Sequence, residues 1–137
     1  MGIATGAYQS CRINEKGEVL FERDFDSVEK ELLLYPNGEF VRLADAIEEV
    51  SNGEINLRNY FFYDDVEYEN PDYTSLQKDF HTFTFDEAIK DGEEALAFIH
   101  QHKEKVQQAY RYTHDPVEVL EYLLQLWENH YYVKYCL

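Results

Sequence analysis

The stretch "HDPVEVLEYLLQLWENH", residues His114–His130, carries the clearest helix-start signal in the chain. Asp115 suits the N-cap, Pro116 the first helical position and Glu118 the third, because these residue types satisfy or tolerate the unbonded N–H groups of a first turn. The apolar residues that follow recur on one helical face: Val119, Leu120, Leu123, Leu124, Trp127 and Tyr131. The stretch therefore predicts a long amphipathic helix whose apolar face packs against another element.

A second helical region is expected just before this helix. Thr84 and Glu87 have the spacing of a capping box. Asp91 and Glu94 repeat that spacing, so Gly92 is expected to bend or divide the helix. Apolar residues continue at helical spacing beyond it: Leu96, Ile99, Val106 and Tyr110. Together with the following helix, this region predicts a helical hairpin joined by a short turn.

The N-terminal part of the chain predicts paired strands. Residues Ile3–Ile13 and Val19–Phe25 have strand-like patterns. Gly17 between them can adopt the positive φ of a tight turn, so the two segments form a predicted hairpin. Asn37 and Gly38 suit another tight turn, which would pair the short segments "LLLY" and "FVRL" as strands.

The middle of the chain predicts a short helix between further strands. Residues 26–29 have the spacing of a capping box and predict a helical turn. Apolar residues lie at helical spacing in Leu43–Val50, and the Asn-Gly pair at 52 and 53 is a favourable stop for that helix. The alternating pattern of Ile55–Tyr63 predicts a strand, and Asp79–Phe85 predicts one more.

Strands first and helices last predict the α+β class. The expected fold is an N-terminal antiparallel sheet of about four to five strands with a short helix, followed by a C-terminal helical hairpin packed on the sheet. The 137 residues suit a single domain, sheet-rich over residues 1–85 and helical over residues 86–137. Cys11 and Cys136 offer no metal spacing, and so few cysteines indicate a reducing, cytoplasmic compartment.

The composition is that of a folded and strongly acidic protein. It is 45% hydrophobic and 16% aromatic, and 28 Asp and Glu against 12 Lys and Arg give a net charge of −16. Such a charge repels phosphate groups, so we expect neither nucleic acid nor an anionic membrane as a direct partner. It favours rapid encounter with a basic protein surface. Solubility alone is the alternative explanation for the acidic balance.

Motifs for catalysis are missing from the sequence. His100 and His102 lie two apart on a predicted helix and point to different sides of it, while His81, His114 and His130 suit a strand or helix ends. Phosphate-binding and nucleophile motifs do not occur, and the acidic residues at 64–72 lack the central glycine of a calcium loop. We therefore expect no catalytic residues, no cofactor and no metal site.

Half of the excess negative charge lies in residues 35–80, which hold eleven acids and three bases. Within it, "NYFFYDDVEYENPDY", Asn59–Tyr73, holds five acids and no Lys or Arg. Clustered like charges repel one another, which favours a binding role, and Tyr is enriched at protein interfaces. A solvated loop after the strand is the alternative. The expected partner-binding residues are Asp64, Asp65, Glu67, Tyr68, Glu69, Asp72 and Tyr73.

The sequence therefore predicts a non-enzymatic, cytoplasmic inhibitor or immunity-type protein that binds the basic, nucleic-acid-binding surface of a nuclease or toxin. Carboxylates would take the place of phosphates against Arg and Lys. Two settings fit: an antitoxin for a co-encoded toxin, or a phage or mobile-element protein that acts against restriction or CRISPR nucleases. One alternative is a structural adaptor that forms a homodimer through its C-terminal helices. The second is a small enzyme whose site the sequence does not reveal.

Overall fold

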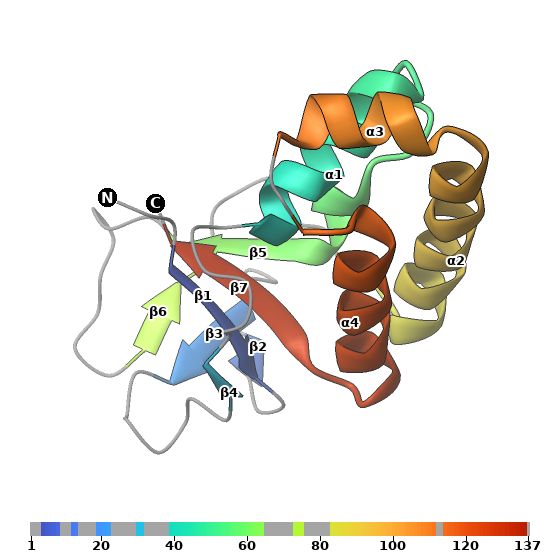
Figure 1. The fold of residues 1–137 in the computed structure, drawn as a ribbon. Helices are drawn as coiled ribbons and strands as arrows, with labels where there is room; N and C mark the ends of the chain where they lie inside the picture. The colour runs from blue at the N-terminus through green and yellow to red at the C-terminus, as the bar shows by residue number, and fades with distance from the viewer. Residues whose placement is uncertain are drawn as a thin grey trace. The chain divides into compact units, whose positions relative to one another are not determined.

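The computed structural model describes residues 4–8, 12–13, 19–22, 30–31, 39–64, 73–75, 83–111 and 114–136. The chain divides into two compact units. The helical unit comprises Glu39–Tyr60 and Phe83–Asn129, and the strand unit comprises Met1–Gly38, Phe61–Thr82 and His130–Leu137. Each unit is built from segments that are far apart in the sequence (Figure 1).

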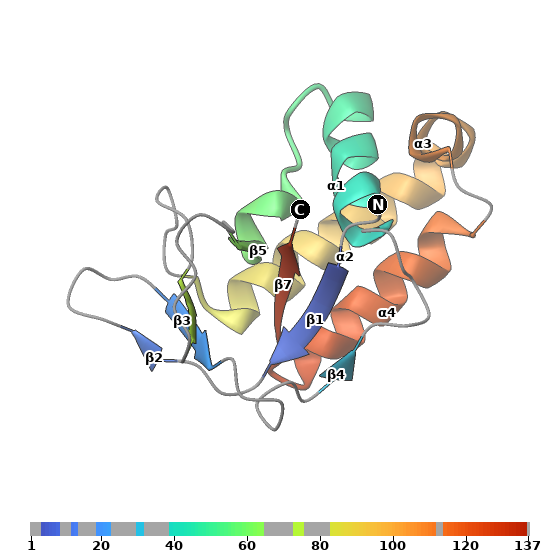
Figure 2. The same ribbon diagram turned by 90° about the vertical axis from the view of Figure 1, so that its left-hand side faces the viewer.

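Four helices make up most of the helical unit: α1 (Glu39–Val50), α2 (Phe85–Gln101), α3 (Lys103–Tyr110) and α4 (Pro116–Glu128). Helix α2 packs along α4, and α1 packs against both α3 and α4. Figures 1 and 2 both show α2 and α4 side by side. The core between the helices is apolar, and its largest fully buried side chains include Trp127, Tyr110, Phe40, Leu43, Ile47, Ile99 and Leu120.

Local capping explains where the helices begin and end. The Thr84 side chain accepts a hydrogen bond from the Glu87 N–H at 3.2 Å, and Asp115 accepts one from the Val117 N–H at 2.9 Å, as the sequence predicts. Helix α1 ends where Asn52 adopts positive φ, which also agrees with the expectation.

Helix α2 does not bend or divide at Gly92 as expected. It continues to Gln101, and the break comes at His102, after which α3 begins. Gly92 is buried instead. A Cβ atom at this position would lie 2.5 Å from Leu124 Cδ2 and 3.2 Å from Trp127 Cζ3. The glycine therefore allows α2 and α4 to approach closely.

The described residues of the strand unit form two sheets. In the first, the order is β4 (Lys30–Glu31), β1 (Ala4–Tyr8), β7 (Tyr132–Cys136) and β5 (Phe61–Asp64). Strand β1 runs antiparallel to β4 and β7, whereas β5 runs parallel to β7. The second sheet is antiparallel, in the order β2 (Arg12–Ile13), β3 (Val19–Glu22) and β6 (Tyr73–Ser75). Only the end of the predicted N-terminal hairpin is present, because β2 pairs with β3, whereas β1, expected in the same strand as β2, pairs with β4 and β7 in the other sheet.

The predicted fold class is wrong. The described residues of the helical unit form four helices packed together and no strand, so helices pack on helices there rather than on a sheet. The segment "FVRL", expected as a strand, lies inside α1. Its apolar side chains belong to a helical pattern of buried residues at Phe40, Leu43, Ala44 and Ile47, which packing favours over the preceding turn signal.

Two other expected strands also differ from the structure. Leu57–Tyr60 forms a 3₁₀ helix, and only Phe61 and the residues after it extend as β5. The Asn56 side chain accepts the Arg58 N–H at 3.1 Å, which favours a turn at this point. The expected strand Asp79–Phe85 ends at the first residue of α2, and its residues 79–82 lie outside the described part of the chain.

The C-terminal region supplies a strand that the sequence analysis missed. Helix α4 ends at Glu128, and the Asn129 side chain donates a hydrogen bond to the Gln125 carbonyl at 2.8 Å. His130 then adopts a positive φ of 61°, which turns the chain away from the helix. Tyr131 therefore lies outside α4, contrary to expectation, and β7 follows. None of the described helices is long and apolar enough to cross a membrane.

Candidate partner-binding surface

The predicted acidic contact segment is described only at its two ends. Asp64 is the last residue of β5 and is paired in register with Cys136. Tyr73 is the first residue of β6 and pairs with Glu22. The expected contact residues between these ends lie outside the described residues: Asp65, Glu67, Tyr68, Glu69 and Asp72. Their role in partner binding therefore stays a prediction.

The helical unit carries a second concentration of carboxylates, on α2. We call the exposed residues Asp86, Glu87, Glu93 and Glu94 the acidic face. Seven residues are almost two full helical turns, so Asp86 lies in line with Glu93, and Glu87 with Glu94, with each pair separated by about 10 Å along the axis. The buried side of α2 consists of Ala88, Gly92, Ala95 and Ile99.

The acidic face holds four carboxylates around one lysine, Lys90, which lies three or four positions from each of them. Helix α2 contains five acidic residues, and its one Lys or Arg is Lys90. Asp86 and Glu87 lie in the first turn, where carboxylates also interact favourably with the helix dipole. Glu93 and Glu94 lie beyond that turn and gain little from the dipole. Glu87 and Glu94 were interpreted from the sequence as capping-box residues, whereas the repeat of acid pairs seven positions apart indicates a shared face.

The fifth acid of α2, Asp91, connects this helix with the core. The Tyr60 hydroxyl donates a hydrogen bond to Asp91 Oδ2. The Tyr60 ring packs edge-on against Phe83, with centroids 5.2 Å apart, and against Trp127 at 5.8 Å. Burial, then the hydrogen bond and charge of Asp91, and then the charges of Glu87 and Glu94 raise the pKa of the Tyr60 phenol above its ordinary value of 10.0. Tyr60 therefore stays protonated beneath the acidic helix.

The histidines do not form a common centre among the described residues. His100 and His130 are exposed, His102 lies between α2 and α3, and His81 lies outside the described part of the chain. The described residues contain no group of three or more His, Cys, Asp or Glu that could hold a metal ion.

The fifth histidine, His114, belongs to a polar cluster around Glu39. Glu39 is the one charged side chain among the described residues that is buried, with 4% of its surface exposed. Its Oε2 atom accepts a hydrogen bond from the Tyr110 hydroxyl at 2.7 Å and lies 2.8 Å from His114 Nδ1. A buried carboxylate needs such partners. The cluster thus joins the start of α1 to the end of α3 and to the residue before the α4 cap.

Comparisons with known proteins add no functional assignment: the chain matches no protein-family model, no curated protein and no solved structure.

Proposed function

We propose that the protein is a non-enzymatic, cytoplasmic inhibitor or immunity-type protein that binds the basic, nucleic-acid-binding surface of a partner nuclease or toxin. The observation that carries the proposal is the acidic face of α2, in a chain whose net charge is −16. Its carboxylates occupy the place of nucleic-acid phosphates. A nuclease of a restriction or CRISPR system, or a co-encoded toxin, has the kind of surface that this chemistry recognises.

The physical basis is charge-assisted hydrogen bonding. Arg guanidinium groups bind carboxylates through two parallel N–H···O bonds, in the same way as they bind phosphates. Two rows of exposed carboxylates along one helix offer several such contacts together. The negative field of the whole chain also attracts the basic partner before contact, so association is fast at low salt and slows as salt screens the charges.

The predicted segment Asp64–Tyr73 provides a second set of carboxylates for the same purpose. The two sets of carboxylates can be mutated separately, because one lies on α2 and the other begins at Asp64, the last residue of β5. Four substitutions neutralise the acidic face: Asp86→Asn, Glu87→Gln, Glu93→Gln and Glu94→Gln. Four others neutralise the loop: Asp64→Asn, Asp65→Asn, Glu67→Gln and Glu69→Gln.

A matched control removes four exposed carboxylates from other helices: Glu104→Gln, Glu118→Gln, Glu121→Gln and Glu128→Gln. The change in net charge is the same in all three variants. The partner is isolated by affinity capture on the wild-type protein, and binding of each variant to the purified partner is then measured by calorimetry at several salt concentrations. A DNA duplex serves as the competitor.

We expect the acidic-face variant to bind the partner at least tenfold more weakly than the control variant, and DNA to compete with the wild-type protein. Affinity that is the same at low and high salt would refute the proposal. So would equal weakening of all three variants, which would show that only net charge matters. Because Asp86 and Glu87 also stabilise the helix start, the pair Glu93→Gln and Glu94→Gln is tested separately, with circular dichroism as the check on folding.

The described apolar side chains of α4 give the adaptor alternative little support. The apolar residues of α4 are buried inside the helical unit, among them Leu120, Leu123 and Trp127. The segment after α4 is strand β7, which already pairs with β1 on one side and with β5 on the other. Oligomerisation through the apolar side of α4 would have to disrupt this core, so the acidic inhibitor is the function that we propose.

A further inference from the structure

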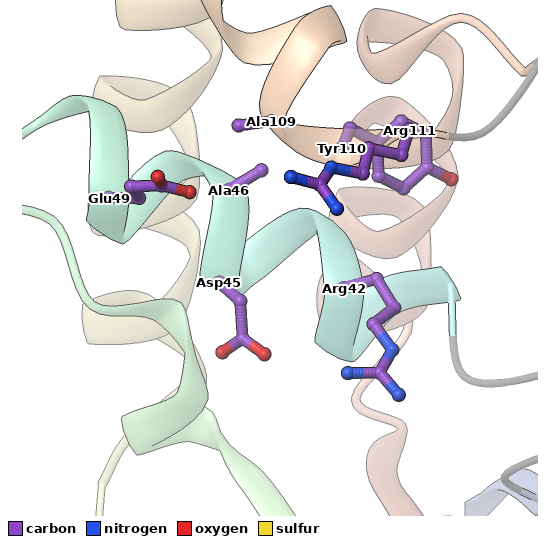
Figure 3. A pocket seen from close by; sticks show the side chains of 7 residues that line it. All are labelled: Arg42, Asp45, Ala46, Glu49, Ala109, Tyr110 and Arg111. Atoms are coloured by element: carbon purple, nitrogen blue, oxygen red, sulfur yellow. The ribbon is translucent and has the colours of Figure 1, made fainter.

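A pocket of about 370 Å³ lies between α1 and the end of α3. Its lining residues are Arg42, Asp45, Ala46, Glu49, Ala109, Tyr110 and Arg111. In Figure 3, Glu49 lies at one end, Arg42 and Tyr110 lie at the other, and the Arg111 side chain reaches from that end over Ala46, whereas the Arg42 side chain extends in another direction. The volume is at the lower end of the range for small-molecule sites, which is roughly 300–1,000 Å³.

The two arginines at the basic end are available for a ligand. Both are exposed, and neither makes an ion pair with any residue that the structure describes. Two other basic residues of the same unit do find carboxylates, since Arg58 Nη1 lies 3.2 Å from Asp45 and Lys103 Nζ lies 3.6 Å from Asp115, whereas Lys90 and Lys105 make no ion pair with a described residue.

The backbone of Arg111 supports a role for its side chain. Arg111 is the C-cap of α3 and has the left-handed conformation, with φ 62° and ψ 12°. A residue with a Cβ atom costs roughly 1–2 kcal/mol in this conformation, and Gly or Asn is usual there. A positive charge favours a helix C-terminus, but a basic residue one turn earlier would provide that without strain. The strained position places the Arg111 side chain over the pocket (Figure 3).

Tyr110 forms one wall of the pocket, and Glu49 lies at the end opposite Arg42. The Tyr110 hydroxyl is held by its 2.7 Å hydrogen bond to buried Glu39, so this wall is fixed in place. At the far end Glu49 is exposed and makes no ion pair with a described residue, whereas Asp45 is already engaged by Arg58. The pocket is therefore positive at one end and negative at the other.

We infer that this pocket binds a ligand that carries a carboxylate and a long cationic side chain, as free arginine or lysine does, or the C-terminal Arg or Lys of a peptide. The carboxylate binds Arg42 and Arg111, and the side-chain cation binds Glu49. Positions 42 and 49 are about 10 Å apart along the helix axis. An α-ammonium group lies too close to its own carboxylate to span that separation, so the cation must be at the end of a side chain. The inference does not depend on the proposed function.

The test titrates the full ¹⁵N-labelled chain with N-acetyl-L-arginine and follows backbone amide shifts. We expect saturable shifts at Ala46, Ala109 and Arg111. Agmatine, which lacks the carboxylate, and N-acetyl-L-citrulline, which lacks the cation, should each bind at least tenfold more weakly. The comparison of free L-arginine with N-acetyl-L-arginine distinguishes a free amino acid from the C-terminal residue of a peptide. Only the free amino acid has an α-ammonium group, so tighter binding of L-arginine would indicate a free amino acid, and tighter binding of N-acetyl-L-arginine would indicate a peptide.

Variants separate binding from folding. Arg42→Gln and Arg111→Gln should each weaken N-acetyl-L-arginine at least tenfold, whereas Lys105→Gln, an exposed residue of α3 outside the pocket lining, should not. Arg111→Gly is the decisive variant: it relieves the backbone strain, so the melting temperature should stay or rise while binding is lost. The absence of saturable shifts at millimolar ligand, or equal binding of agmatine and N-acetyl-L-arginine, would overturn the inference.

Discussion

The close approach of α2 and α4 at Gly92 makes a quantitative prediction. A Cβ atom there would lie 2.5 Å from Leu124 Cδ2 and 3.2 Å from Trp127 Cζ3. In an open helix, Gly→Ala stabilises by about 1 kcal/mol. Insertion of a methyl group into a packed contact costs about 1–3 kcal/mol. Gly92→Ala should therefore lower the free energy of unfolding by about 0–2 kcal/mol, despite the better helix propensity of alanine.

Ala97→Gly provides the matched control, because Ala97 is exposed on the same helix. It should lower the free energy of unfolding by about 1 kcal/mol, which measures the propensity difference alone. Urea unfolding followed by circular dichroism gives both values, provided that the slope m does not change. If Gly92→Ala instead raised the free energy of unfolding by about 1 kcal/mol, the close approach of α2 and α4 would be refuted.

A larger substitution and a compensating one extend the test. Gly92→Val should destabilise more than Gly92→Ala, because it adds further methyl groups against the same neighbours and has a stiff side chain. Leu124→Ala alone should cost about 2–5 kcal/mol by leaving a cavity. Combined with Gly92→Ala it should cost less than the sum of the two single changes, since the new methyl group occupies part of that space. Additive effects would show that the two residues do not touch.

Two further predictions concern buried polar groups. Tyr60→Phe should lower the free energy of unfolding by about 1.5–3 kcal/mol, because it removes the bond to Asp91. The pKa of Tyr60 in the folded protein is raised above the unfolded value of 10.0. The stability that the Tyr60 hydroxyl contributes is therefore present below pH 10 and is lost as the pH rises further. Unfolding curves of the wild-type protein and of Tyr60→Phe at rising alkaline pH would check this. A double-mutant cycle between Tyr110→Phe and His114→Ala should show coupling of about 0.5–3 kcal/mol, because both side chains contact Glu39. Additivity in that cycle would contradict a shared cluster.

The sequence predicts those parts of the fold that depend on neighbouring residues. The starts of α2 and α4 follow from Thr84 and Asp115, whose side chains bond N–H groups two or three residues away. The end of α1 at Asn52 is equally local. The helix predicted over Leu43–Val50 is confirmed as the larger part of α1, but its start is four residues earlier, at Glu39, where the turn signal at positions 37 and 38 had favoured a strand.

Distant pairings were not predictable in this way. Strand β7 pairs with β1 and β5. The sequence of residues 132–136 does not indicate which distant segments of the chain it pairs with. The Glu39–His114 contact likewise joins the start of α1 to a residue between α3 and α4. For the candidate site, the overall acidic character could be predicted, but the acidic face of α2 required the helix to be placed with its buried side against α4.

The central position of β7 has a consequence for synthesis. Ala4 of β1 pairs with Cys136, so the first sheet cannot be completed until the residues of β7 have left the ribosome, although β1 can pair with β4 before then. Until then β1 and β5 are without the strand that separates them in the sheet, which exposes their backbone groups to chaperones or to other chains. Contacts between residues so far apart also form slowly. We expect ribosome-bound chains that lack residues 132–136 to be far more sensitive to protease in β1 and β5 than the released protein.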